Sequence, residues 1–152
     1  MLLTGELNLA LLELEYLTYL DLSNNDFKFL QFDSKSRGNS SNLHYLDLSH
    51  NYDILVHNLH WISNLSSLQY LNLGGVHIHK EIDWLRSVTL LPSLLELHLR
   101  GCQLETKYPF VQYANFTSLQ VLNLAHNHFL SELPSWLFNL SCHISHNDLV
   151  RK

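Results

Sequence analysis

Leucines alternate with polar residues in five short stretches that recur along the chain. The stretches open at Leu17, Leu43, Leu68, Leu94 and Leu119, and they contain the pairs Leu46/Leu48, Leu71/Leu73, Leu97/Leu99 and Leu122/Leu124. A period of two residues is typical of a strand with one buried face. The pattern therefore predicts one short strand per copy. The rest of each copy must lead the chain back to begin the next strand alongside, which predicts a parallel sheet.

The spacing between the copies predicts a solenoid. One position recurs at Asn25, Asn51, Val76, Cys102, Asn127 and Asn147, with steps of 26, 25, 26, 25 and 20 residues. This is the period of a leucine-rich repeat, in which each copy stacks on its neighbours. We predict an α/β fold: a right-handed, curved leucine-rich-repeat solenoid of about six repeats. Its parallel sheet would lie on the concave face.

The whole chain is expected to be one array without caps. The predicted repeats lie near residues 1–16 (partial), 17–42, 43–67, 68–93, 94–118, 119–139 and 140–152 (degenerate). No run of apolar residues reaches the roughly 18 of a membrane span. The first 17 residues contain three glutamates and no basic leader, so we also expect no signal peptide and no anchor in this chain.

The recurring asparagine has a predicted structural role. A buried amide both donates and accepts, so it can satisfy backbone groups where the chain leaves the strand. We assign this structural ladder to Asn25, Asn51, Cys102, Asn127 and Asn147. A ladder role outweighs a catalytic one for Cys102, because a thiol is a weaker donor that this position tolerates. Val76 cannot donate, so its copy is expected to lack this bond and to be locally looser.

Composition and motifs argue against several function classes. The chain has a formal net charge of −5 and a pI near 6.1, without the basic stripe that nucleic acid requires. Two cysteines give neither a disulfide framework nor a metal knuckle. No nucleophile elbow, P-loop or kinase motif is present. We therefore expect no enzyme, no catalytic residue, no metal site and no cofactor, since an open solvated face also lacks the pocket that tunes an acid–base pair.

Four Asn-x-Ser/Thr sequons indicate a glycosylated surface. They begin at Asn39, Asn64, Asn115 and Asn139. The first three each stand four residues before the opening leucine of the next copy. A single sequon is weak evidence, because Asn and Ser are common in repeats. The shared register favours glycans and hence secretion.

The strand positions that point away from the leucines are the predicted ligand-binding residues. They are Tyr19, Asp21, Tyr45, Asp47, Tyr70, Asn72, Glu96, His98, Arg100, Asn123 and His126. The tyrosines are typical binding anchors, although cross-strand stacking alone would also account for them. The aspartates fit an ordinary solvated scaffold better than ligand contacts. The copy with Glu96, His98 and Arg100 departs from the repeat pattern and is favoured for specific contacts.

The eleven histidines suggest a dependence on pH. If about ten became charged near pH 5.5, the formal net charge would move from −5 to roughly +5. We hypothesise that His50, His98 and His126 then favour an acidic ligand. An affinity that does not change between about pH 7.5 and 5.5 would remove this idea.

Several longer stretches resemble plant receptor-like proteins, and most closely the xylanase-receptor type. They are Trp61-Ile-Ser-Asn-Leu-Ser-Ser-Leu-Gln-Tyr-Leu-Asn-Leu, Trp84-Leu85 with Leu91-Pro-Ser-Leu-Leu-Glu-Leu-His-Leu-Arg-Gly-Cys-Gln-Leu104, Asn127-His-Phe-Leu-Ser-Glu-Leu-Pro-Ser-Trp-Leu-Phe-Asn-Leu140 and residues 9–17. The resemblance implies an ectodomain fragment of a glycoprotein on the extracellular face of the plasma membrane. It also implies a protein or peptide ligand, a co-receptor kinase as partner, and a role in signal perception or defence.

The chain also departs from this family. The segment Gly-x-Ile-Pro, which follows each strand in the family, survives only as Ser131-Glu-Leu133-Pro134, and the last copy is about five residues short by the repeat period. Two alternatives therefore stay open, a secreted repeat-type inhibitor of a microbial enzyme and a truncated, non-functional receptor remnant. An intracellular immune-receptor repeat region is a weaker possibility.

Overall fold

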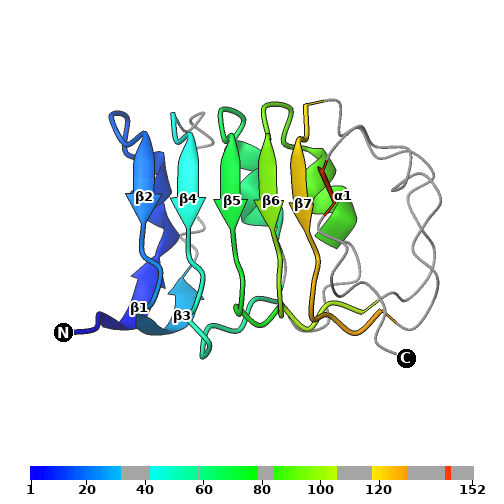
Figure 1. Ribbon diagram of the computed structural model, residues 1–152. Coiled ribbons are helices and arrows are strands. Elements are labelled where there is room, and N and C mark those ends of the chain that lie inside the picture. Colours follow the sequence, from blue (N-terminus) through cyan, green and yellow to red (C-terminus); the bar gives the residue numbers. More distant parts are fainter. Residues whose placement is uncertain (32–41, 58, 79–83, 106–117, 130–142, 145–152) are drawn as a thin grey trace.

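The computed structural model describes residues 1–31, 42–57, 59–78, 84–105, 118–129 and 143–144. These residues form two parallel sheets. The larger sheet has six strands: β2 (Tyr19–Asp21), β4 (Tyr45–Asp47), β5 (Tyr70–Asn72), β6 (Glu96–His98), β7 (Val121–Asn123) and β8 (His143–Ile144). Its strands lie side by side in chain order (Figure 1). The predicted parallel sheet with one short strand per copy is confirmed in this part of the chain.

The alternation of side chains explains which face of this sheet is buried. Leu46, Leu71 and Leu97 occupy the middle of successive strands, pair in register, and have no exposed surface. The leucines two positions later are buried as well, and the backbone ladder continues past the strand ends, where Leu48 N donates to Asn72 O over 2.9 Å. The leucines thus stack from copy to copy in one hydrophobic core.

Short helices fill the return segments on the other side of this core. They are the 3-10 helices η1 (Leu9–Glu13) and η2 (His60–Asn64) and the α-helix α1 (Trp84–Thr89). Helix α1 lies behind the strands in the view of Figure 1 and packs against η2. Ile62, Trp84 and Val88 point their apolar side chains into the core, so η2 and α1 cover the core of their own copies on this side.

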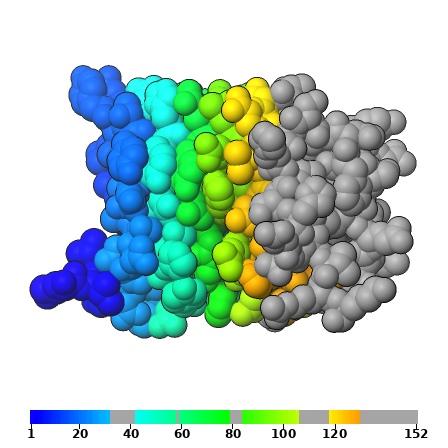
Figure 2. Space-filling model, viewed as in Figure 1, coloured from blue at the N-terminus to red at the C-terminus, as the bar shows by residue number. Residues whose placement is uncertain are grey.

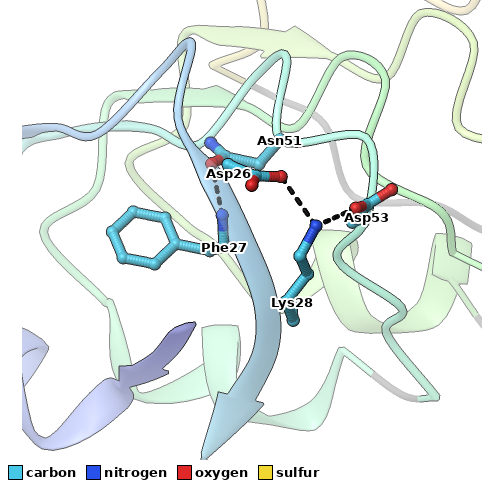
Figure 3. Close-up of polar contacts among 5 residues, drawn as sticks. All are labelled: Asp26, Phe27, Lys28, Asn51 and Asp53. Carbon is cyan, nitrogen blue, oxygen red and sulfur yellow. Dashed lines mark hydrogen bonds and ion pairs between the residues drawn. The ribbon is translucent and has the colours of Figure 1, made fainter. Parts of the chain in front are cut away.

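A second, two-stranded sheet pairs β1 (Thr4–Asn8) with β3 (Asp26–Gln31). Strand β3 is tied to the following copy by a polar cluster (Figure 3). Lys28 Nζ bonds Asp26 Oδ1 at 2.8 Å and also bonds the Asp53 carboxylate. The hydrogen bonds raise the pKa of Lys28 and lower the pKa of Asp53. These side chains are exposed, and exposed ion pairs contribute little to stability.

The buried amide of Asn51 is the stronger connection between copies. Its Nδ2 donates to Leu22 O and Leu48 O, both at 2.9 Å, and its Oδ1 accepts from Phe27 N at 3.5 Å. Asn51 therefore binds the backbone of its own copy and of the preceding copy. Asn127 makes the same type of contacts, donating to Leu99 O over 2.7 Å and accepting from Leu104 N over 3.0 Å.

The remaining ladder positions differ in exposure and chemistry. Asn25 is half-buried, donates to Leu22 O over 3.0 Å and accepts from Leu3 N over 2.9 Å. Val76 has no exposed surface, and the lower local stability expected of its copy stays a prediction. Asn147 lies outside the described residues.

Candidate ligand-binding site

The outward face of strands β2, β4, β5, β6 and β7, with the residues that directly follow each strand, is called the sheet face below. Figure 2 views the molecule from the side on which these strands lie. All eleven predicted ligand-binding residues belong to these strands or to the turns that follow them. The sheet face is organised in columns that run across the strands, because parallel strands in register place equivalent residues side by side.

The first column is a stack of aromatic rings. The ring centroids of Tyr19 and Tyr45 are 4.2 Å apart and those of Tyr45 and Tyr70 are 4.3 Å apart. The His98 ring, from the neighbouring column, lies 5.3 Å from Tyr70 and is tilted against it by 37°. Burial raises the pKa of both Tyr45 and Tyr70, so their hydroxyls stay protonated. The ring faces of Tyr45 cover those of its neighbours, which leaves ring edges and hydroxyls for a ligand.

The second column has a structural task at the strand ends. In four strands the side-chain oxygen accepts a hydrogen bond from the backbone N–H two residues later. The pairs are Asp21 with Ser23 (2.9 Å), Asp47 with Ser49 (2.8 Å), Asn72 with Gly74 (3.0 Å) and Asn123 with Ala125 (3.1 Å). This is an Asx-turn, which Asp and Asn form readily. The fifth member, His98, instead bonds Glu96 Oε2 over 3.3 Å, so its ring serves no such turn.

A further column sits just after each strand in a left-handed backbone conformation. Its members and their φ angles are Asn24 (54°), His50 (59°), Gly75 (83°), Gly101 (65°) and His126 (57°). Glycine and, less readily, asparagine and histidine adopt this conformation. Two adjacent copies therefore carry no side chain at this column, whereas the copies on both sides carry histidine. The result is a hollow between His50 and His126.

This hollow is a pocket of about 490 Å³ on the sheet face. Its lining residues are Ser49, His50, Tyr52, Asn72, Gly74, Gly75, His98, Arg100, Gly101, Asn123 and His126. Arg100 Nη2 lies 2.8 Å from His126 Nε2 at one end, and His50 Nδ1 lies 2.7 Å from the Tyr52 hydroxyl at the other. The pocket, called the glycine pocket below, brings together the side chains of four successive copies.

The glycine pocket contains only part of the predicted site. It includes Asn72, His98, Arg100, Asn123 and His126. The predicted residues Tyr19, Asp21, Tyr45, Asp47, Tyr70 and Glu96 lie on the sheet face outside its lining. The predicted ligand-binding set did not include Ser49, His50, Tyr52, Gly74, Gly75 and Gly101, although His50 was considered for its charge at low pH. The three glycines were the available signal, since missing side chains in adjacent columns leave space on a sheet surface.

The lining carries positive charge and no negative charge. Arg100 is the charged residue, and no Asp or Glu belongs to the lining. Of the neighbouring acids, Asp47 accepts from Ser49 N and from Asn72 Nδ2 (2.9 Å), while Glu96 contacts His98. Among the residues that the structure describes, no three metal-ligating side chains come together. The pocket is therefore suited to anionic or hydrogen-bonding ligands rather than to a cation.

The buried thiol of Cys102 lies behind the sheet and away from this pocket. The Cys102 side chain has no exposed surface, and its Sγ lies 3.0 Å from Leu73 O, to which it donates. It thereby supplies a bond to the copy that contains Val76. Burial raises the pKa of Cys102 to about 12. Cys142 lies outside the described residues.

We predict that Cys102 does not react with thiol reagents while the chain is folded. A Cys142→Ser variant isolates this thiol, and labelling with iodoacetamide at about pH 8 should proceed at least about 100-fold more slowly than in urea, because the thiolate is the reactive form. Since the folded pKa is raised, stability should also fall as pH rises above about 8.5, the pKa of a free cysteine. Fast labelling of the native chain would contradict the ladder role.

Parallel one-strand copies, a shared leucine core and amide bonds between copies define this chain as a leucine-rich-repeat protein. The Leucine Rich Repeat family model matches residues 16–35 and 118–140. The chain belongs to the leucine-rich-repeat receptor-like proteins of plants, as its similarity to three curated relatives shows.

Two of these relatives come from Solanum lycopersicum. Receptor-like protein EIX1 is 37% identical over 97% of this chain, and Receptor-like protein EIX2 is 37% identical over 99%. Receptor-like protein 47 of Arabidopsis thaliana is 32% identical over 70% of the chain. The chain spans 17%, 18% and 13% of the lengths of these relatives. No solved structure matches the chain significantly.

None of the helices in the described ranges has the length and hydropathy needed to cross a membrane.

Of the four predicted glycosylation sites, Asn64 is exposed at the end of η2. Asn39, Asn115 and Asn139 lie outside the described residues.

Proposed function

We propose that this chain is a ligand-recognition module of a plant cell-surface receptor-like protein, and that it binds a protein or peptide ligand on the sheet face. The observation that carries the proposal is the combination of a rigid stacked scaffold with a pocket whose lining departs from the repeat pattern. Asp21, Asp47, Asn72 and Asn123 stabilise strand ends, whereas His98 and Arg100 have no equivalent task. Residues that a scaffold does not need are the ones available for recognition.

The curated relatives support the receptor role over a secreted inhibitor, because all three are named receptor-like proteins. We extend the proposal to an extracellular location in the parent protein, glycosylation, and signalling in defence through a co-receptor kinase. We also propose that the solenoid is curved, since a concave sheet face would surround a ligand on more than one side.

Passage of the chain through a plant secretory pathway should attach an N-glycan to Asn64. Asn64 and Ser66 of this sequon are both exposed, so the transferring enzyme can reach the acceptor amide. Enzymatic glycan release in heavy-oxygen water converts an occupied Asn to labelled Asp, and mass spectrometry of the peptide then reports occupancy. Ser66→Ala is the matched control that removes the sequon and keeps Asn64. An unmodified Asn64 in secreted protein would argue against the extracellular assignment.

Ligand recognition can be tested by capture from plant or microbial extracellular fluid on the immobilised chain. Proteins and peptides retained by the native chain are compared with those retained by a Tyr70→Ala/His98→Ala variant of the sheet face. An Arg86→Ala/Leu90→Ala variant, at two exposed positions in and directly after α1, is the matched control. We expect specific ligands to be lost from the first variant and kept by the second. Equal retention by both variants would overturn binding on the sheet face.

A further inference from the structure

The glycine pocket has an uneven shape that suggests how a ligand enters it. A Cβ atom added at Gly101 would meet no atom within 4 Å, whereas one added at Gly75 would lie 2.7 Å from the Tyr52 ring. The floor is therefore open over Gly101 and walled by an aromatic ring over Gly75. A floor without side chains lets the backbone of a bound segment approach closely. The pocket has a volume of about 490 Å³ and is open to solvent along the sheet face.

The charge of Arg100 is not neutralised within the described part of the chain. Its Nη2 lies 2.8 Å from His126 Nε2, and a guanidinium can only donate, so the contact is a hydrogen bond to a ring nitrogen and not to a carboxylate. The ion pairs present among these residues involve Lys28 and His98, not Arg100. A guanidinium presents several N–H donors in a planar fork, so donors remain available beside the one that reaches His126.

Building on the proposed function, we propose that the glycine pocket binds a carboxylate of an acidic peptide segment and that Arg100 anchors it. Carboxylate and guanidinium match in geometry and form paired, charge-assisted hydrogen bonds. The three histidines singled out in the sequence, His50, His98 and His126, all line this pocket. No acid belongs to the lining, and the neighbouring carboxylates of Asp47 and Glu96 are bonded to the lining residues Asn72 and His98. The carboxylate comes from an Asp or Glu side chain or from the C-terminus of the peptide.

Binding can be followed at the pocket floor in the full chain labelled with ¹⁵N. The amide signals of Gly74, Gly75 and Gly101 are recorded while three peptides of equal length are added. One alternates Gly with Glu and is blocked at both ends, one has Gln in place of Glu, and one contains only Gly with a free C-terminal carboxylate. A galacturonic acid oligosaccharide tests a non-peptide source of the same group.

Two substitutions probe the anchor and the space. Arg100→Gln removes the charge, with Arg86→Gln on α1 as the matched control. Gly101→Asn adds a side chain to the pocket floor, where the backbone is left-handed. Asparagine tolerates this conformation, as Asn24 does in its own copy. We expect the Glu peptide or the free C-terminus to shift the three glycine signals. Arg100→Gln should weaken this binding at least about tenfold, Gly101→Asn should abolish it, and Arg86→Gln should leave it unchanged.

The outcomes separate this inference from the proposed function. Absence of glycine shifts with both acidic peptides, or binding that Arg100→Gln leaves intact, would overturn the carboxylate site. Response to the oligosaccharide alone would overturn the assignment to a peptide. If the Tyr70→Ala/His98→Ala variant nevertheless fails to capture a ligand that the native chain retains, the proposed function still holds. Conversely, if the Tyr70→Ala/His98→Ala variant captures the same ligands as the native chain, the proposed function is refuted even if the Glu peptide binds.

Discussion

Replacing Asn51 by alanine should lower the free energy of unfolding by about 2 to 3 kcal/mol. The Asn51 side chain is fully buried, and its amide donates to Leu48 O and Ser49 O within its copy and to Leu22 O in the preceding copy. Leu22 O keeps a second donor, Asn25 Nδ2, at 3.0 Å. Ser49 O likewise keeps Asn24 N as a donor, at 2.9 Å. Leu48 O and Phe27 N lose their bonds to the amide at a buried position, and a buried polar group without a partner costs about 1 to 3 kcal/mol.

Asn25→Ala is the matched control, since it removes an equivalent amide from a half-buried position. Water can replace its bonds to Leu22 O and Leu3 N, so we expect a loss below about 1.5 kcal/mol. Urea titration of the full chain, followed by far-UV circular dichroism, gives both values from the midpoint and slope. Equal losses for the two variants would show that the buried amide of Asn51 is not what connects the copies.

Periodic signals in the sequence predicted the sheet because they are local and repeated. Leu46, Leu71 and Leu97 recur at nearly constant steps, and a two-residue alternation around each of them specifies a buried face. Parallel order then follows, because each strand must be reached through a return segment of similar length. The short helices η2 and α1 were not predicted. Segments of five or six residues are too short to show a helical period, and their packing decides their conformation.

The glycine pocket was only half predicted, since its shape depends on groups that are missing. The departure of His98 and Arg100 from the repeat pattern was visible in the sequence. The space beside them arises because Gly75 and Gly101 follow the adjacent strands β5 and β6 and lie next to each other. This proximity depends on the register in which the two strands pair. The sequence also did not assign the Asx-turns of Asp47 and Asn72. An acid on an outward strand position has the same pattern whether it binds a ligand or its own backbone.

Replacing Leu71 by alanine should lower the free energy of unfolding by about 3 to 5 kcal/mol, the largest effect that we expect from a single substitution. Leu71 has no exposed surface and lies in register between Leu46 and Leu97, which are equally buried. Truncation removes about three methyl or methylene groups and leaves a cavity between copies that cannot close, because the β-ladder fixes the distance between strands.

Leu20→Ala in β2 is the matched control, because Leu20 is the middle residue of its strand, as Leu71 is in β5. Leu20 is half-buried and pairs with Leu46 in β4, so its truncation should cost about 1 to 2 kcal/mol, by the lost burial with little cavity. Urea titrations of both variants at the same temperature give the comparison. Because a solenoid copy is stabilised by the copies on each side, the difference between Leu71 and Leu20 measures the contribution of the second neighbour. Similar losses at the two positions would mean that each copy holds its own core, and the stacked array would then not be what stabilises the sheet face.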